Sequence, residues 1–447
     1  MPANVQFALY AVLLGGFFVA ALWRPPAAIA AVLCLYGLKQ WGQTSNGWLA
    51  AHSSFTNFAI GAVVLVALAS RVARSKCILC NIRGAGWVVI ALYGYCLLSL
   101  IWTPRPDLAL AMWASAAPYV ITGILLAPLV IGDADDLYQA CWILLILGGT
   151  LVVALLAFAK WGERGLLISG FSPTSDMETN PLAIANLGGA VATAAMFLRT
   201  RLLPAASWLV RLGLVAAALA LVVKTGSRGQ LVTVIATLVL MLPVAFPISR
   251  IRGLIPIFMA VAVVGMAAQY SAQTLIKRDD DRWSQRDTVA AASERWRMGS
   301  LLLSHWADSP ATVVFGLGNS AAYDPEIIGI YPHDVPVEVL GEEGLVGLAI
   351  YLSLNGLALR GFLRSWRVTR DNPQQRPLLA VAAANFVFAW VTTFKEGNMV
   401  PAVEYFMAAI LLARMPELLA ARTAPTAATP ATIAVAPPRP LFANIMR

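Results

Sequence analysis

His333 is the side chain in this sequence best suited to acid–base chemistry. It is one of three histidines, with His52 and His305, and it stands in the run Tyr331-Pro332-His333-Asp334-Val335-Pro336 at the end of a long polar segment. An imidazole is the only side chain whose ordinary charge change falls near neutral pH. A histidine in a membrane protein is more often a packing residue, so the surrounding sequence has to decide between these interpretations.

Arg228 is the first of two arginines placed to bind an anion. It lies in the run Lys224-Thr225-Gly226-Ser227-Arg228-Gly229-Gln230, between two adjacent apolar segments. Ser227 is expected to cap a helix that begins at Gly229, and the glycines on both sides would let the backbone approach a ligand. An ionisable residue at the depth of a membrane interface is a functional candidate.

Arg295 is the second such arginine. It lies near the front of the segment 293–306, whose apolar residues recur at helical spacing; these are Met298, Leu302, Leu303 and Trp306. The pattern predicts an amphipathic helix near the membrane surface, with Arg295 close to its start. A guanidinium at the positive end of a helix suits phosphate oxygens. The alternative is a surface arginine that pairs with a carboxylate.

The helix expected after His333 supplies a further catalytic candidate. Asp334 is expected to cap this helix, and Pro336 is tolerated in its first turn. Glu338 lies about one turn later, where it either orients the imidazole or interacts with the helix dipole as an ordinary helix-start carboxylate. The stretch Gly316-Leu317-Gly318-Asn319 is suited to hydrogen-bonding a sugar. The lesser candidates for binding substrate are Lys277, Arg297 and Lys395.

We expect neither a metal site nor a cofactor. Asp279, Asp280 and Asp281 are adjacent, but consecutive carboxylates do not converge on one cation without further ligands. Cys77 and Cys80 form a Cys-x-x-Cys pair that lacks the two further ligands zinc needs.

The composition is that of a polytopic α-helical membrane protein. The chain is 59% hydrophobic and only 12% charged, about half the charge of an ordinary soluble domain. Runs long enough to cross hydrocarbon occur at about 6–22, 27–40, 54–70, 85–102, 108–131, 137–160, 181–198, 207–223, 229–247, 253–270, 341–359, 378–394 and 400–414. These runs are too continuous for barrel strands, so they predict helices.

Basic residues between the runs set the orientation. They cluster at Arg71–Arg83, Arg199–Arg201, Arg250–Arg252 and Arg360–Arg376, which places these connections in the cytoplasm and the long loop outside. The net charge of +9 therefore reflects topology, and we expect no nucleic-acid partner.

The expected organisation has four parts. These are N-terminal transmembrane helices (1–270), a partly helical periplasmic loop that carries the candidates (271–340), C-terminal transmembrane helices (341–415) and a disordered cytoplasmic tail (416–447). If the short run 27–40 crosses fully, there are thirteen transmembrane helices and the N-terminus lies outside; otherwise there are twelve. We favour about twelve, with the first run a retained helix rather than a cleaved signal peptide, because no basic segment precedes it.

The order of the spans and several motifs resemble the O-antigen ligase and polymerase superfamily. The motifs are Ser227-Arg228-Gly229, Ser293-x-Arg295, Pro310 followed by Gly316-x-Gly318, and His333 followed by Leu340-x-Glu342-x-Gly344-x-x-Gly347; Asn180-Pro181-Leu182-Ala183 also resembles a family segment. Many members have Asn after the histidine, where this chain has Asp334. The run 335–340 looks more like the ligase (WaaL) branch.

The resemblance implies an inverting, GT-C-like glycosyltransferase of the bacterial inner membrane. It would move an O-antigen glycan from undecaprenyl diphosphate to a sugar hydroxyl of lipid A-core, at a site facing the periplasm, with membrane lipids around it. Arg228 and Arg295 could neutralise the diphosphate without a metal, and His333 could take the proton of the attacking hydroxyl.

Two alternatives stay open at the level of sequence. An O-antigen polymerase or a protein O-oligosaccharyltransferase would use the same donor and the same residues and differ in the acceptor. A lipid or ion transporter would explain the spans, but should place ionisable residues at the bilayer midplane rather than at the outer rim.

Overall fold

The computed structural model describes residues 3–74, 81–162, 165–168, 179–198, 204–246, 285–395 and 398–423. These residues are almost entirely helical, as predicted. The run at 253–270, Cys77, Cys80, Lys277, Asp279 to Asp281 and the tail from 424 lie outside them.

The first half of the chain forms helices that follow the predicted apolar runs. They are α1 (Ala3–Trp23), α2 (Ala27–Ser45), α3 (Gly47–Ala51), α4 (Phe55–Ala73), α5 (Gly84–Ser99), α6 (Pro106–Tyr119) with η2 (Val120–Leu126) and η3 (Ala127–Val130), α7 (Ala134–Ile143) with η4 (Leu144–Gly148) and α8 (Gly149–Phe158), α9 (Pro181–Phe197), α10 (Pro204–Lys224) and α11 (Arg228–Ala245). Pro118, inside α6, precedes the switch into η2, because a proline removes one helical hydrogen bond.

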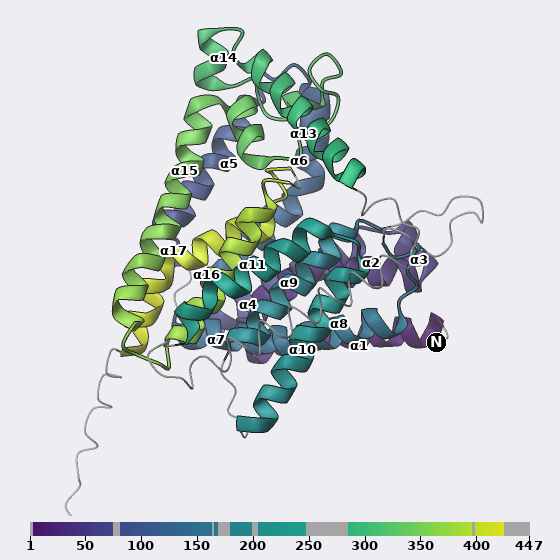
Figure 1. Ribbon diagram of the computed structural model, residues 1–447, viewed down its shortest axis with the longest axis vertical. Helices are drawn as coiled ribbons and strands as arrows, with labels where there is room; N and C mark the ends of the chain where they lie inside the picture. The colour runs from purple at the N-terminus through teal and green to yellow at the C-terminus, as the bar shows by residue number, and fades with distance from the viewer. Residues whose placement is uncertain are drawn as a thin grey trace, which may run out of the picture.

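The second half supplies the polar end of the molecule and the last long helices. These are α13 (Gln285–Trp306), α14 (Pro310–Phe315), η6 (Ala321–Tyr323), α15 (Val335–Thr369), α16 (Arg376–Thr392) and α17 (Val403–Thr423). Figure 1 shows α13 and α14 at one end of the molecule, beside the first turns of α15, whereas α15 and α17 run side by side toward the opposite end. The helix α17 extends eight residues beyond the predicted start of the tail at 416.

Seven stretches of the described helices are long and apolar enough to cross a membrane. They are Asn4–Trp23, Phe55–Ala73, Pro106–Val130, Ala134–Phe158, Ser207–Lys224, Arg228–Ala245 and Val335–Thr369. Three shorter apolar helices, Gly84–Ser99, Pro181–Phe197 and Arg376–Thr392, accompany them. The protein is therefore an integral, polytopic membrane protein.

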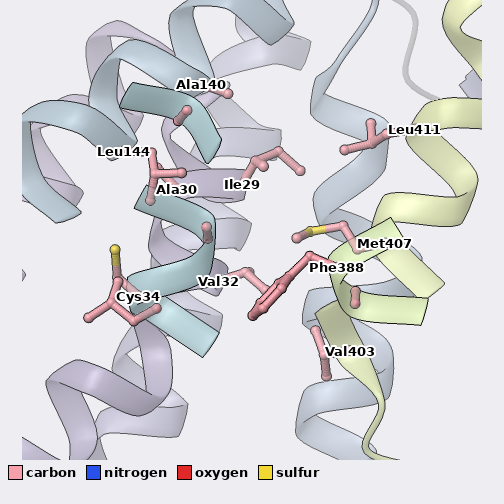
Figure 2. Packing of buried hydrophobic residues seen from close by; sticks show 14 of the residues in the cluster. Ile29, Ala30, Val32, Cys34, Ala140, Leu144, Phe388, Val403, Met407 and Leu411 are labelled. Carbon is pink, nitrogen blue, oxygen red and sulfur yellow. The ribbon is translucent and has the colours of Figure 1, made fainter. Parts of the chain in front are cut away.

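The helices pack closely through small residues. A Cβ atom on Gly188 of α9 would lie 2.9 Å from the carbonyl oxygen of Ala218, and one on Gly189 would overlap the ring of Phe388. Small residues let helices approach where lipid gives no hydrophobic drive for association. Figure 2 shows the centre of this packing, where Met407 and Phe388 point from α17 and α16 toward Val32 of α2.

Several arginines at the end opposite α13 bind helix carbonyls. Arg71 forms a buried ion pair with Asp136 at 2.8 Å, and its Nη1 also donates to the carbonyl of Val130. Arg376 donates from Nε to the carbonyl of Val244 near the end of α11. Cations at helix C-termini are favoured by the helix dipole, so these arginines stabilise the fold in addition to the topological role that the sequence suggests.

Candidate active site

The turn that carries His333 is fixed at both ends. Asp334 Oδ1 accepts a hydrogen bond from Val337 N at 3.1 Å, which confirms that Asp334 caps α15. Val335 N donates to the carbonyl of Thr393 at 2.9 Å, so the start of α15 is tied to the end of α16. The cap uses a side-chain oxygen, which asparagine could supply equally well.

His333 itself has an unusual backbone conformation. Its φ is 60°, and the only other residue besides glycine with positive φ in the described part of the chain is Ser320. Positive φ costs a residue other than glycine about 1–3 kcal/mol, although His, Asn and Asp adopt it more often than other residues, and such conformations cluster at functional sites. The imidazole is half-buried, with its centroid 4.2 Å from the ring of Tyr331.

Arg295 acts electrostatically on His333. Burial, and after it the positive charge of Arg295, hold the pKa of His333 below its usual value. The imidazole is therefore neutral at physiological pH, which is the form that can accept a proton. The structure thus brings together two of the residues that the sequence singled out.

The packing of α13 on α15 accounts for this pairing. Met298 and Leu302 are buried, as the amphipathic pattern predicts. A Cβ atom on Gly341 would lie 2.5 Å from Leu302 Cγ, so the two helices meet closely at this point. One turn earlier on each helix, a Cβ atom on Gly299 would lie 3.5 Å from Val337 Cγ1. One further turn brings Arg295 to the level of His333.

The expected start of this helix was wrong. Helix α13 begins at Gln285, ten residues before Arg295. The residues between Gln285 and Ser293 include three alanines and no glycine or proline. Their helical propensity lets the helix begin earlier in the chain than Ser293. Arg295 therefore lies in mid-helix, and its influence on an anion comes from its own charge rather than from the helix dipole.

The N-terminus of α11 carries Arg228 instead. Arg228 is the first residue of α11, one earlier than expected, and Gly226 has the positive φ, 69°, that this turn requires. Ser227 occupies the N-cap position, but its side chain makes no capping hydrogen bond. Its buried Oγ has no hydrogen-bond partner within the described residues. The positive helix end, the guanidinium and an unsatisfied hydroxyl meet here.

Lys395 lies against the same helix end. Its Nζ donates to Gln230 Oε1, and a Cβ atom on Gly229 would lie 2.3 Å from Nζ. The missing side chain at Gly229 thus makes room for a lysine from the connection after α16. Since Thr393 binds Val335 two residues earlier in the same connection, this short segment joins the Arg228 end of α11 to the His333 turn.

Glu338 is buried in the first turn of α15, and its partner is a backbone amide. Its Oε2 accepts from Met399 N at 3.0 Å, at the start of the segment that leads into α17. Glu338 therefore ties the His333 turn to the α16–α17 connection from a second side.

Glu342 and Glu343 are two buried carboxyl groups whose positions the sequence interpretation did not foresee. Glu342 accepts from Ser320 N at 2.7 Å and from Ala322 N at 3.0 Å. Glu343 Oε1 accepts from Asn319 Nδ2 at 3.0 Å. Both side chains thus bind the loop between α14 and η6. The only sequence signal for them is the Leu340-x-Glu342-x-Gly344 pattern itself.

The Gly316–Asn319 turn is a packing element, which corrects its expected role in binding a sugar. Leu317 N and Gly318 N donate to the carbonyls of Gly341 and Glu342, at 3.0 and 2.8 Å. Asn319 is buried and also accepts from Trp113 Nε1 at 2.9 Å. Its donors and acceptors are used inside the protein, so this turn holds the start of α15 in place.

Replacing Gly316 with alanine is expected to destabilise this support. Gly316 has a φ of 82°, and an added Cβ atom would lie 2.1 Å from the carbonyl oxygen of Glu342. The backbone strain alone is about 1–3 kcal/mol, so the midpoint of thermal unfolding should fall by several degrees. Gly356→Ala, also on α15, is the control, because its Cβ atom would meet nothing within 4 Å. Equal midpoints for the two variants would contradict the assigned role.

A polar cavity of about 420 Å³ adjoins the His333 turn. Its wall includes Tyr331, Lys39 and Gln40 of α2, Asn398 in the segment before α17, and Glu404 in the first turn of α17. Gln40 Nε2 donates to the carbonyl of Asn180, while its buried Oε1 has no partner within the described residues. The cavity therefore offers a cation and an unsatisfied acceptor beside Tyr331, whose ring contacts the imidazole of His333.

The pH dependence of any reaction at this site is expected to follow the protonation of His333, whose pKa is lowered in part by Arg295. A base acts in its neutral form, so kcat/KM should rise with pH through the pKa of free His333. Burial and Arg295 lower that pKa, so the acidic limb lies below that of an ordinary histidine. Arg295→Gln removes the charge and should move the limb to higher pH. An unmoved limb would show that the charge of Arg295 does not act on the imidazole.

The lesser candidates have separate positions. Arg297 forms an exposed ion pair with Glu294, with Nη2 and Nε at 2.5 and 2.9 Å from the carboxylate oxygens. Its guanidinium is thus engaged on the surface of α13.

Within the described ranges, no group of three or more His, Cys, Asp or Glu residues is arranged to hold a metal ion.

The comparison with known families covers the part of the chain that contains this site. Residues 212–352, about a third of the chain, match a family model described as O-antigen ligase. No curated protein matches the chain. The matched residues include Arg228, Arg295, His333 and Glu338, whereas Lys395 lies beyond them. The segment that builds most of the candidate site is therefore similar to the O-antigen ligase family.

Proposed function

We propose that this protein is an O-antigen ligase. It transfers a glycan from undecaprenyl diphosphate to a sugar hydroxyl of lipid A-core, at the periplasmic face of the bacterial inner membrane. The observation that carries the proposal is the half-buried His333, electrostatically coupled to Arg295 beside a polar cavity, within a segment similar to the O-antigen ligase family.

The proposed reaction is a single inverting displacement. The acceptor oxygen attacks the anomeric carbon, the bond from that carbon to the diphosphate oxygen breaks, and the acceptor proton passes to the free nitrogen of His333. The leaving diphosphate gains negative charge, which Arg228 and Arg295 neutralise without a metal. Lys395 and the unsatisfied Ser227 hydroxyl, both at the N-terminus of α11, can contribute further donors to the phosphate oxygens.

Glu338 acts in this proposal as a positioning residue. It does not have to touch substrate, because its hydrogen bond to Met399 N holds the connection that carries Lys395 against the start of α15. Catalytic groups need this kind of support, since small displacements of a reacting group cost large factors in rate.

The shape of the cavity supports an amphipathic substrate. The polar cavity shares Asn186, Ala389 and Glu404 with a narrower apolar pocket between α2, α7, α16 and α17. A substrate with a polar head and a hydrocarbon tail can place its head near Tyr331 and its chain toward the membrane interior. Polyprenyl-linked and lipid A-linked sugars both have this character.

The arrangement of α1 and α4 bears on the number of membrane crossings. Tyr10 of α1 binds Thr56 of α4, and Arg74 after α4 binds the carbonyl of Trp23, so the two helices run in the same direction. Helix α2 therefore has to return between them, although it is less apolar than the stretches that can cross a membrane by length and composition alone. This favours thirteen crossings with the N-terminus outside over the twelve that we expected.

The test is a reconstitution with defined acceptors. Purified protein in liposomes is given a lipid-linked glycan together with lipid A-core, with excess donor alone, or with an acceptor protein, all with a chelator present. Glycan transfer to lipid A-core is the expected result. Chain extension of the donor would identify a polymerase, and transfer to protein an oligosaccharyltransferase. Transfer that starts only after a divalent cation is added would contradict the metal-free mechanism.

A further inference from the structure

Another pocket lies at the end of the molecule opposite the candidate active site. Its volume is about 210 Å³, and it is lined by the start of α5, the last part of α15 and the last part of α17. Helix α15 is kinked at Gly344, and its second part rises by about 22 Å from Leu345 to Arg360. Figure 1 shows the two ends of α15 at opposite ends of the molecule. The pocket and the His333 turn therefore face opposite sides of the membrane.

The lining of this pocket is rich in arginine. It includes Arg83, Arg360, Arg364 and Arg414, against the single carboxylate Glu417. Arg83 pairs with Glu417 at 3.2 Å, and Arg414 donates to the carbonyls of Pro128 and Ile131. One carboxylate cannot neutralise four guanidinium groups, so the pocket has a net positive charge.

Arg360 and Arg364 supply the positive charge that a ligand in this pocket could bind. They lie four residues apart on α15, so their side chains emerge on the same face, one turn from each other. Neither forms a hydrogen bond or an ion pair with any residue that the structure describes. Gly361, between them, is closely covered by α17, since a Cβ atom there would lie 2.4 Å from the carbonyl oxygen of Leu412.

The start of α5 adds backbone donors to the same pocket. Gly84 and Ala85 line it as the first two residues of the helix, where amide groups have no helical acceptor. Arg83 occupies the N-cap position without a capping side-chain hydrogen bond. Two arginines without partners, a third arginine and these amides together suit one anionic group of the size of a phosphodiester.

We infer that this pocket binds the phosphodiester headgroup of an anionic membrane phospholipid in the leaflet opposite the active site. The pocket lies among membrane-spanning helices, where a lipid headgroup is present at high local concentration. Basic pockets between transmembrane helices on the cytoplasmic side are suited to such headgroups. The inference does not depend on the proposed glycan transfer, because the two sites share no residue.

The experiment is native mass spectrometry of the full-length protein in a neutral detergent. The protein is titrated with phosphatidylglycerol, with phosphatidylcholine of the same acyl chains, or with inorganic phosphate. Phosphatidylglycerol should give one tight adduct. The double variant Arg360→Gln/Arg364→Gln should raise the dissociation constant of phosphatidylglycerol about 25-fold. Each arginine near a charged membrane surface contributes a factor of about five, and the variant removes two.

A matched double variant controls for the loss of charge. Arg367→Gln/Arg370→Gln removes two exposed arginines outside the pocket, one in the last turn of α15 and one just after it, and should leave the dissociation constant unchanged. If the pocket double variant does not fold, Arg364→Gln alone should still show the fivefold change. Equal affinities in all variants, equal retention of phosphatidylcholine, or inorganic phosphate bound as tightly as the lipid would each overturn the inference.

Discussion

Replacing His333 is expected to lower the turnover number of glycan transfer by about 10²–10⁴-fold, the usual contribution of a general base. Binding of the lipid-linked donor should remain, because a base acts mainly in the transition state. His333→Asn is the sharper variant. Asparagine adopts positive φ more readily than alanine, so the strained turn is kept while the base is lost.

The measurement is transfer to lipid A-core at saturating donor, with donor binding followed separately. His305→Ala is the matched control, because His305 lies in the last turn of α13 near Asp308, is partly exposed and is ten residues from Arg295. Its turnover should be unchanged. Near-normal turnover in both His333→Asn and His333→Ala would exclude His333 as the base.

The local features of the site followed from the sequence because short-range chemistry determines them. Asp334 before a proline-containing helix start is a strong capping signal, and the structure has that hydrogen bond. The apolar spacing of Met298 and Leu302 predicted which face of α13 is buried. Neither feature needs knowledge of distant segments.

The helix start before Arg295 shows where local rules were insufficient. Ser293 resembles a capping residue, yet the alanine-rich stretch before it has no residue that stops a helix. The start of α11 moved by only one residue, from Gly229 to Arg228, which is within the usual uncertainty of a helix boundary. Only the position of Arg295 relative to a helix end changes: Arg228 lies at a helix start, as expected, whereas Arg295 lies in mid-helix.

The contacts that hold the site together depend on tertiary packing and were not accessible from one sequence. Lys395 reaches Gln230 across 165 positions of the chain, and Glu338 reaches Met399 across 61. A carboxylate near a helix start looks the same in sequence whether it meets solvent or a buried amide. Only the packing of α16 and α17 on α15 distinguishes these cases.

The two arginines are expected to contribute separately to binding the diphosphate. Arg228→Ala and Arg295→Ala should each lower kcat/KM about 10²–10³-fold, the typical cost of removing one donor to a developing anion. Lysine should restore little at either position, because a single ammonium cannot form two parallel hydrogen bonds to phosphate oxygens. Transfer kinetics and donor binding are both measured.

The pH profile then separates the roles of Arg228 and Arg295. Removing Arg295 should also shift the acidic limb set by His333, whereas removing Arg228, at the end of α11, should not. Arg105→Ala serves as the control, since Arg105 is exposed and pairs with Asp107 at 3.3 Å. If Arg228→Ala and Arg295→Ala both keep the donor affinity while Arg105→Ala loses it, the diphosphate binds elsewhere. Loss confined to Arg228→Ala would assign the diphosphate to the end of α11 and leave Arg295 as a residue that tunes His333.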